Sequence, residues 1–206
     1  MNVHTQALQL QGQAGLVEAL LDEPQGAVVG TAVIAHPHPL FGGTMNNKVV
    51  QTLARAFVQC GWRAVRFNFR GVGASQGEHD AGRGEAQDML QVVQQVAPHG
   101  PLALAGFSFG AFVTTHVVAG LAERRVAKLV LVGTAASRFD VAPVPAAVHE
   151  HTLVLHGEQD DTVPLDSVMS WARPQHLPVT VIPGVEHFFH GQLPLLKSLV
   201  VRHLRA

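Results

Sequence analysis

The sequence predicts an α/β fold in a single domain that spans residues 1–206, with a mostly parallel eight-stranded sheet and helices on both of its faces. Short apolar runs rich in Val, Leu and Ala show little alternation, which is typical of strands buried on both faces of a parallel sheet. Helical patterns separate most of these runs, and repeated strand and helix units build an α/β sandwich. Apolar residues make up 47% of the chain and charged residues only 14%, against a usual charged share of about 25%, so much of the chain should be buried.

The first elements are expected to be an antiparallel strand pair, a third strand and a helix. Residues 3–10 and 15–21 alternate or form short apolar runs on either side of a glycine-containing turn, as paired strands do. The run V-V-G-T-A-V-I-A-H at residues 28–36 predicts the third strand, and a helical pattern extends from Thr44 to about Cys60. Thr44 can cap the start of this helix, and Gly61 can end it in a left-handed conformation.

The rest of the chain repeats the strand and helix pattern. Apolar runs predict further strands at residues 63–69, 101–107, 128–133, 152–157 and 177–183. Helical patterns cover residues 84–96, 110–121 and 192–204. Residues 142–147, which include two prolines, predict a loop.

The charge and the N-terminus exclude several classes of partner. The formal net charge is −1, the sequence pI is about 6.9, and the 14 Lys and Arg residues are scattered rather than clustered. We therefore expect no nucleic acid and no membrane among the partners. The first residues lack a basic region followed by an apolar stretch, and no segment approaches the roughly 18 apolar residues of a membrane span, so we expect a soluble cytoplasmic protein. Cys60, the single cysteine, offers no disulfide and no metal-binding pair.

One serine stands where an apolar run ends and a helical pattern begins. Ser108 is the centre of G-F-S-F-G, and Gly-x-Ser-x-Gly at a strand-to-helix turn is typical of a nucleophile elbow, in which strained backbone projects the hydroxyl above the sheet edge. A side chain at either glycine would strike the adjacent strand or helix. The helix that follows also points unsatisfied N–H groups toward the place where an oxyanion would form. The alternative interpretation is a helix-capping serine between packing glycines.

A serine nucleophile requires a histidine base and a carboxylate that orients it, in loops after later strands and in the chain order serine, acid, histidine. The loop E-Q-D-D-T-V-P after residues 152–157 offers Asp160, with Asp161 and Glu158 as competitors. The loop G-V-E-H-F-F-H-G after the last predicted strand offers His187 and His190. Each partner therefore occurs where the topology requires it.

The sequence resembles the α/β-hydrolase superfamily, and more closely the small bacterial hydrolases related to dienelactone hydrolase that carry little or no lid. The resemblance rests on five blocks in the right order, A-H-P-H-P-L-F-G-G-T-M, R-F-N-F-R-G-V-G-A-S, G-F-S-F-G, H-G-E-Q-D-D-T-V-P and E-H-F-F-H-G. The family pattern His-Gly-x-x-Asp-x-x-Val selects Asp160, and a histidine before aromatic residues selects His187. Asp161 is then expected to cap or to supply a first-turn acid for a helix beginning near Pro164, and His190 to cap or pack at a helix start.

The resemblance also implies where an oxyanion would be bound. One N–H would come from Phe109, the residue after the nucleophile, and another from the loop H-P-H-P-L-F-G-G. Pro37 and Pro39 lack an N–H, so His38 matches the donor position and Leu40 is the alternative. For the side chains of His36 and His38 we prefer local hydrogen bonding to a metal site, because no Cys or carboxylate lies close in sequence to complete a ligand set.

Two further loops complete the functional interpretation. In F-N-F-R-G-V-G-A-S-Q-G the spacing required for a nucleotide-binding glycine loop is absent, and we expect a structural turn in which Arg70 fixes neighbouring loops. Residues 134–150 are too few for a helical lid, so the site should be open. Apolar acyl-pocket candidates are Phe41, Phe107, Phe109, Phe188 and Phe189, of which we expect two or three to touch substrate.

These observations favour a serine hydrolase with a Ser108, His187 and Asp160 triad that works through an acyl-enzyme. The substrate class we favour is a small or medium acyl ester or thioester, which makes the protein a carboxylesterase that needs no cofactor and no metal. The alternatives are a catalytically silent, hydrolase-like binding protein and an acyltransferase that uses the same triad. The sequence leaves open whether an exposed apolar face pairs two copies into a homodimer.

Overall fold

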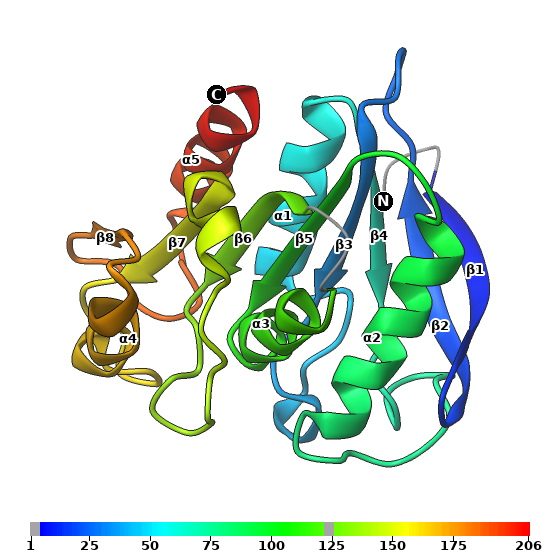
Figure 1. Ribbon diagram of the computed structural model, residues 1–206, viewed down its shortest axis with the longest axis horizontal. Coiled ribbons are helices and arrows are strands. Elements are labelled where there is room, and N and C mark those ends of the chain that lie inside the picture. The colour runs from blue at the N-terminus through cyan, green and yellow to red at the C-terminus, as the bar shows by residue number, and fades with distance from the viewer. Residues whose placement is uncertain (1–4, 122–125) are drawn as a thin grey trace.

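The computed structural model describes residues 5–121 and 126–206 and contains the eight-stranded sheet that the sequence predicts (Figure 1). The strands lie in the order β1-β2-β4-β3-β5-β6-β7-β8. Their bounds are β1 Thr5–Gly12, β2 Gly15–Asp22, β3 Gly30–Ala35, β4 Trp62–Phe67, β5 Leu102–Phe107, β6 Val126–Val132, β7 Thr152–Gly157 and β8 Val179–Ile182. The predicted start of the first strand at residue 3 lies outside the described residues.

The direction of the strands confirms the predicted sheet. β1 pairs antiparallel with β2, and β2 pairs antiparallel with β4, whereas every other neighbouring pair is parallel. The strands from β3 to β8 therefore end at one common edge, which is the lower edge in Figure 1. Ligands of open α/β sheets bind outside the carboxyl ends of the strands, so this edge is where a site is expected.

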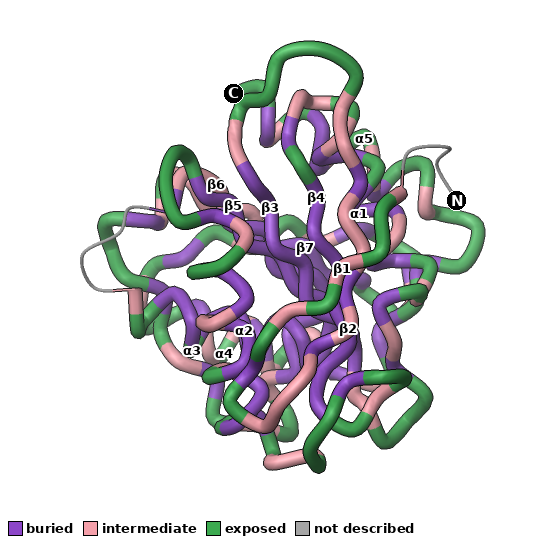
Figure 2. The backbone as a smooth tube through the Cα atoms, turned by 90° about the vertical axis from the view of Figure 1, so that its right-hand side faces the viewer, coloured by how far each residue is buried: buried purple, intermediate pink, exposed green. Residues whose placement is uncertain are grey.

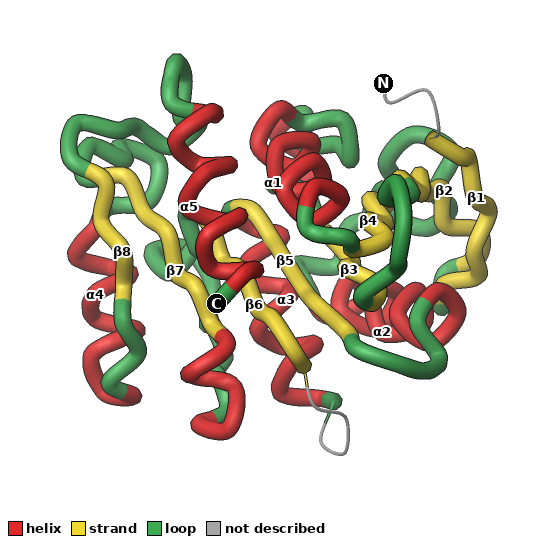
Figure 3. The backbone as a smooth tube through the Cα atoms, turned by 90° about the horizontal axis from the view of Figure 1, so that it is seen from above, coloured by secondary structure: helices red, strands yellow, loops and turns green. Residues whose placement is uncertain are grey.

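Helices cover both faces of the sheet. Their bounds are α1 Lys48–Gln59, α2 Arg83–Val96, α3 Phe109–Gly120, α4 Leu165–Ala172 and α5 Leu193–Arg205, with short 3₁₀ helices at Pro39–Phe41, Ala146–His151 and Arg173–Gln175. Seen from above, α1 and α5 lie on one side of the strands, and α2, α3 and α4 lie on the other (Figure 3). The sequence-based α/β sandwich is thereby confirmed.

The central strands are apolar throughout because both of their faces are covered. Successive residues of β3 alternate between two core clusters: Val33 and Ala35 belong to the cluster beneath α2 and α3, and Ala32 and Ile34 to the cluster beneath α1 and α5. All four side chains are fully buried. The buried residues lie in the middle of the molecule, and exposed loops surround them (Figure 2). This two-sided burial explains why these runs show little polar alternation.

The start of α1 differs from the sequence-based expectation. Thr44 was expected to cap this helix, and that prediction is wrong: the N-cap is Asn47, whose side chain accepts a hydrogen bond from the N–H of Val49 at 2.8 Å. Thr44 instead closes a turn before the helix, since its carbonyl accepts from the N–H of Asn47. The predicted end is correct, because Gly61 follows the helix with φ of 83°.

The connection between β6 and β7 carries no lid. Residues 133–151 are described throughout and contain only the short 3₁₀ helix Ala146–His151, so the expectation of a minimal lid or none is confirmed. The carboxyl edge of the sheet is consequently left open next to this connection.

Candidate active site

Ser108 occupies a strained turn between β5 and α3. Its φ of 56° and ψ of −116° lie in a region that residues with a side chain seldom adopt. A Cβ at Gly106 would lie 2.4 Å from the carbonyl oxygen of Gly110, and a Cβ at Gly110 would lie 2.5 Å from the carbonyl oxygens of Ala35 and His36. Both glycines are therefore required for the strand and the helix to approach closely enough to form the turn.

Three side chains from separate loops meet above this turn. The Nε2 atom of His187 lies 3.1 Å from Oγ of Ser108, and its Nδ1 atom lies 2.6 Å from Oδ2 of Asp160. Ser108 follows β5, Asp160 follows β7 and His187 follows β8. An ionised Asp160 only accepts hydrogen bonds, so Nδ1–H of His187 donates to it and leaves the Nε2 lone pair facing the serine hydroxyl. The three residues are 2–8% exposed.

The loop backbone fixes the second carboxylate oxygen of Asp160. Oδ1 accepts hydrogen bonds from the N–H groups of Thr162 at 3.0 Å and Val163 at 2.7 Å. The competitor Glu158 accepts from the N–H of Gly184 instead. The expectation that Asp161 caps the following helix or supplies its first-turn acid is wrong, because Pro164 is the N-cap of α4 and the acid of its first turn is Asp166.

His190 takes no part in this group of side chains. It is exposed, and its backbone N–H and its Nδ1 atom both lie within 3.0 Å of a carboxylate oxygen of Glu186. The N-cap of α5 is Gln192, so the expected capping or packing role of His190 is wrong. A local pair with Glu186 holds the residue on the outside of the loop.

His38, in the loop after β3, lines the same cavity as Ser108. The carbonyl of His38 accepts hydrogen bonds from the N–H groups of Phe41 and Gly43, and the N–H of Leu40 is 3.2 Å from Nδ1 of His38. No hydrogen bond from the N–H of His38 occurs within residues 5–121 and 126–206. The N–H of Phe109 is at the first position of α3, where an N–H has no partner within the helix. Of the two candidate N–H donors in the loop after β3, that of Leu40 is therefore already hydrogen-bonded.

His36 ties the loops after β3 and β4 together. Its Nδ1 atom lies 2.6 Å from the carbonyl oxygen of Pro37, and its Nε2 atom accepts from the N–H of Phe69 at 3.0 Å. Burial lowers the pKa of His36 to about 4, so the imidazole is neutral near pH 7. Both ring nitrogens thus serve in the local hydrogen bonding that we expected for this side chain.

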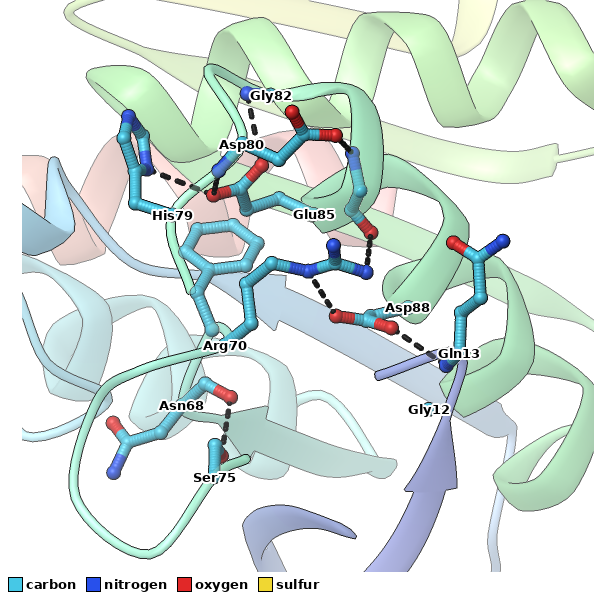
Figure 4. A network of polar contacts seen from close by, with 12 residues as sticks. Gly12, Gln13, Asn68, Arg70, Ser75, His79, Asp80, Gly82, Glu85 and Asp88 are labelled. Atoms are coloured by element: carbon cyan, nitrogen blue, oxygen red, sulfur yellow. Dashed lines mark hydrogen bonds and ion pairs between the residues drawn. The ribbon is translucent and has the colours of Figure 1, made fainter. Parts of the chain in front are cut away.

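Arg70 joins the loop after β4 to α2, as expected (Figure 4). Its guanidinium donates to Asp88 at 2.8 Å and to the carbonyl oxygen of Gly84 at 2.9 Å. Next to it, the Nδ1 atom of His79 lies 2.8 Å from Glu85, and the ring of His79 contacts that of His38 with centroids 4.9 Å apart. This buried network therefore supports the loop that carries the His38 N–H.

A cavity of about 290 Å³ lies in front of Ser108. Of the five predicted phenylalanines, Phe41, Phe109 and Phe188 line it, whereas Phe107 and Phe189 are fully buried in the core. Phe139 also lines it, which the sequence analysis did not identify. The sequence does show an aromatic residue at this position, shortly after the carboxyl end of β6. The length and the prolines of this loop, from which we interpreted it, do not indicate that Phe139 lines a cavity.

His156 is a second residue that the sequence analysis did not single out. It is fully buried at the end of β7, its Nε2 atom lies 2.9 Å from the carbonyl oxygen of Val163 and 3.5 Å from Oδ2 of Asp160. Its Nδ1 atom has no hydrogen-bond partner among the described residues. The Nε2–H group therefore closes the loop that carries Asp160. The signal was the histidine of H-G-E-Q-D, four residues before the acid.

Comparison with known proteins identifies the family. A family model described as alpha/beta hydrolase fold matches residues 38–151. The uncharacterized protein RP471 of Rickettsia prowazekii (strain Madrid E) is 30% identical over 195 residues, which cover 86% of this chain and 79% of the relative. The chain belongs to the α/β hydrolase fold family. The resemblance drawn from the five sequence blocks is thereby confirmed.

Solved structures place this α/β hydrolase among the lidless bacterial members. XC6422 of Xanthomonas campestris, described as an a/b serine hydrolase without lid, is 34% identical with a TM-score of 0.89, and the match covers 100% of this chain and 95% of that one. A serine hydrolase homologue from Coxiella burnetii is 40% identical with a TM-score of 0.83, covering 97% of both chains. These similarities support hydrolase activity in general. Among the described residues of this α/β hydrolase, no helix has the length and apolar character needed to cross a membrane.

Proposed function

We propose that this α/β hydrolase is a carboxylesterase in which Ser108 is the nucleophile, His187 is the general base and Asp160 is the carboxylate that orients the imidazole. The observation that carries the proposal is the continuous chain of hydrogen bonds from Oγ of Ser108 through His187 to Asp160, at 3.1 and 2.6 Å. A serine hydroxyl is a weak nucleophile, and this arrangement supplies the base that activates it.

The reaction begins when Oγ of Ser108 attacks the ester carbonyl carbon while Nε2 of His187 takes the hydroxyl proton. Asp160 accepts a hydrogen bond from Nδ1–H throughout and stabilises the imidazolium that forms. The carbonyl oxygen gains negative charge in the tetrahedral intermediate, and the N–H groups of Phe109 and His38 donate hydrogen bonds to it. Donors of this kind are each worth about 3 kcal/mol in the transition state when measured by removal.

The intermediate collapses when the ester C–O bond breaks and His187 returns the proton to the leaving alkoxide, which departs as the alcohol. The acyl group remains bonded to Oγ of Ser108. A water molecule then repeats the sequence in the second half-reaction: His187 takes its proton, the hydroxide adds to the acyl carbon, and the carboxylic acid leaves as Ser108 regains the proton. Asp160 keeps its hydrogen bond with Nδ1–H of His187 in both halves.

The cavity favours small or medium acyl groups. Its volume of about 290 Å³ lies at the lower limit of ordinary small-molecule sites, and Phe41, Phe109, Phe139 and Phe188 give it largely apolar walls. The lidless edge leaves the entrance open to water-soluble esters and thioesters. The proposal therefore names short-chain and medium-chain esters before long-chain lipids.

Labelling with a fluorophosphonate probe tests the nucleophile. The probe should modify the wild-type protein at Ser108, and Ser108→Ala should abolish the labelling. The same substitution should lower the turnover of p-nitrophenyl esters, tested over a series of chain lengths, by about 10⁶-fold. Ser167→Ala is the matched control, because Ser167 does not line the cavity and, among the described residues, its half-buried hydroxyl donates only to the carbonyl of Pro164. Folded wild-type protein that resists the probe, or labelling that survives in Ser108→Ala, contradicts the proposal.

A further inference from the structure

Arg138 lines the same cavity as Ser108, and it is the one lysine, arginine, aspartate or glutamate among the residues that line it. Most of the other lining residues are apolar or glycine, and four of them are phenylalanines: Phe41, Phe109, Phe139 and Phe188. A single permanent positive charge therefore faces a cavity whose walls are mostly aromatic or aliphatic. A neutral, apolar ester would gain nothing from that charge.

The guanidinium of Arg138 is free to bind a ligand. Within residues 5–121 and 126–206 it makes no ion pair and no hydrogen bond. Four other arginines behave differently: Arg63, Arg66, Arg70 and Arg83 each pair with a carboxylate of this chain. An arginine presents planar donors that match a carboxylate or a phosphate in two parallel hydrogen bonds.

The backbone around Arg138 is anchored next to the nucleophile. The N–H groups of Arg138 and Phe139 both donate to the carbonyl oxygen of Ala135, which closes a tight turn after β6. The ring of Phe139 is stacked on Phe112 with centroids 4.7 Å apart, and it contacts the ring of Phe109, the residue after Ser108, at 5.2 Å. The backbone of Arg138 is therefore held in place at the cavity that Ser108 lines.

The charge of Arg138 also acts on His38 in the loop after β3. Burial lowers the pKa of His38, and the nearby His79 and Arg138 lower it further. The ring of His38 contacts Phe109 and Phe139, with centroid separations of 4.9 and 5.8 Å. Arg138 is an exposed residue at the mouth of the cavity, so an anionic group of a bound substrate can reach its positive charge while the ester carbonyl lies near the loop that carries His38.

We propose that Arg138 binds an anionic group of the substrate, so that the enzyme prefers esters bearing a carboxylate or phosphate over neutral esters of the same size. This inference rests on the proposed esterase function and adds the substrate class. Arg138 acts in this proposal as a specificity-determining residue, while the bond-breaking steps remain with Ser108 and His187.

The test compares matched pairs of esters that differ by one negative charge. Mono-p-nitrophenyl glutarate against p-nitrophenyl pentanoate places the charge on the acyl side, and p-(carboxymethyl)phenyl acetate against p-tolyl acetate places it on the leaving side. In the wild type, kcat/KM should favour the anionic member of at least one pair by about 10- to 100-fold, the usual worth of a hydrogen bond to a charged group. The preferred pair tells which side of the ester faces Arg138.

Variants connect the preference to this residue. Arg138→Gln should lower the anionic-to-neutral ratio of kcat/KM by about tenfold or more, Arg138→Glu should invert the preference, and Arg138→Lys should keep part of it. Arg205→Gln removes the same charge from the end of α5, at the opposite edge of the sheet, and should leave the ratio unchanged (Figure 1). The wild-type ratio should also fall as salt is added.

Two results overturn the proposal. One is equal kcat/KM for both members of both pairs in the wild type, and the other is a preference that persists in Arg138→Gln. Either result leaves the esterase proposal intact if neutral esters are hydrolysed in a Ser108-dependent way. If no ester is turned over, calorimetric titration of glutarate into Ser108→Ala, with and without Arg138→Gln, decides: binding that depends on Arg138 supports the anion site, and its absence refutes it.

Discussion

The strain at Ser108 is offset by tight contacts on both sides of it. The N–H of Ser108 donates to the carbonyl of Val132 at 2.8 Å, and its carbonyl accepts from Ala111 and Phe112 in the first turn of α3. These hydrogen bonds join the turn to the neighbouring strand and to its own helix. A backbone conformation that costs about 1–3 kcal/mol therefore persists, because the surrounding structure allows no relaxed alternative.

His156 provides a prediction at the residue scale. His156→Phe keeps an aromatic ring but removes the Nε2–H group, which leaves the carbonyl of Val163 unpaired and loosens the loop that carries Asp160. We expect the rate constant of fluorophosphonate labelling at Ser108 to fall about tenfold, because small displacements of catalytic groups cost up to about 100-fold.

The controls for His156 separate positioning from folding. His156→Gln retains an N–H donor and should recover part of the labelling rate, while thermal melting of both variants reports any general loss of stability. A His156→Phe protein that labels Ser108 at the wild-type rate would show that the histidine serves packing alone.

At the scale of elements, the loops after β3 and β4 at the carboxyl edge of the sheet are held by side-chain contacts with neighbouring elements. The loop after β3 is held by His36 through the N–H of Phe69, and the loop after β4 is held by Arg70 through Asp88. Asp88 also accepts from the N–H of Gln13 at the β1 to β2 turn, so α2 connects the N-terminal hairpin to the site (Figure 4). The antiparallel hairpin thus supports the loops around Ser108.

Removing Asp88 tests this element-scale support. Asp88→Ala leaves the buried guanidinium of Arg70 without its partner, and we expect the free energy of unfolding to fall by about 3–5 kcal/mol. Glu23→Ala breaks the more exposed pair with Arg63 and should cost about 0–1 kcal/mol. Urea unfolding of the three proteins measures the difference, and equal losses in the two variants would contradict a structural role for the Arg70 and Asp88 pair.

At the scale of the whole molecule, buried histidines make stability depend on pH. Burial lowers the pKa of His36 to about 4, and burial with the nearby Lys128 lowers that of His203 to about 4. In the unfolded chain a histidine has a pKa of about 6.5, so between pH 6.5 and 4 the unfolded state binds more protons than the folded state. The stabilisation is therefore complete above pH 6.5 and is lost as the pH falls toward 4.

Urea unfolding across this window measures the effect. We expect the free energy of unfolding to decline from pH 7 to pH 4.5, with His36 accounting for up to about 3 kcal/mol and the partly exposed His203 for less. His203→Gln should reduce the slope, whereas His99→Gln, at an exposed turn, should not. Stability that stays constant between pH 7 and 4.5, or a slope that His203→Gln leaves unchanged, would contradict this account.

The sequence by itself determined the elements, their order and the elbow at Ser108, because these depend on local patterns: two-sided apolar runs, helical periodicity and glycines that permit close approach. It also placed Asp160 and His187 in the correct loops, although from the residues alone Asp161 and His190 stood equally well. Only the tertiary structure decided which side chains turn inward, because in irregular loops that direction is set by contacts between separate loops, such as that of His187 with Asp160. For the same reason Arg138 and Phe139 could not be identified as cavity residues before the strands were in place.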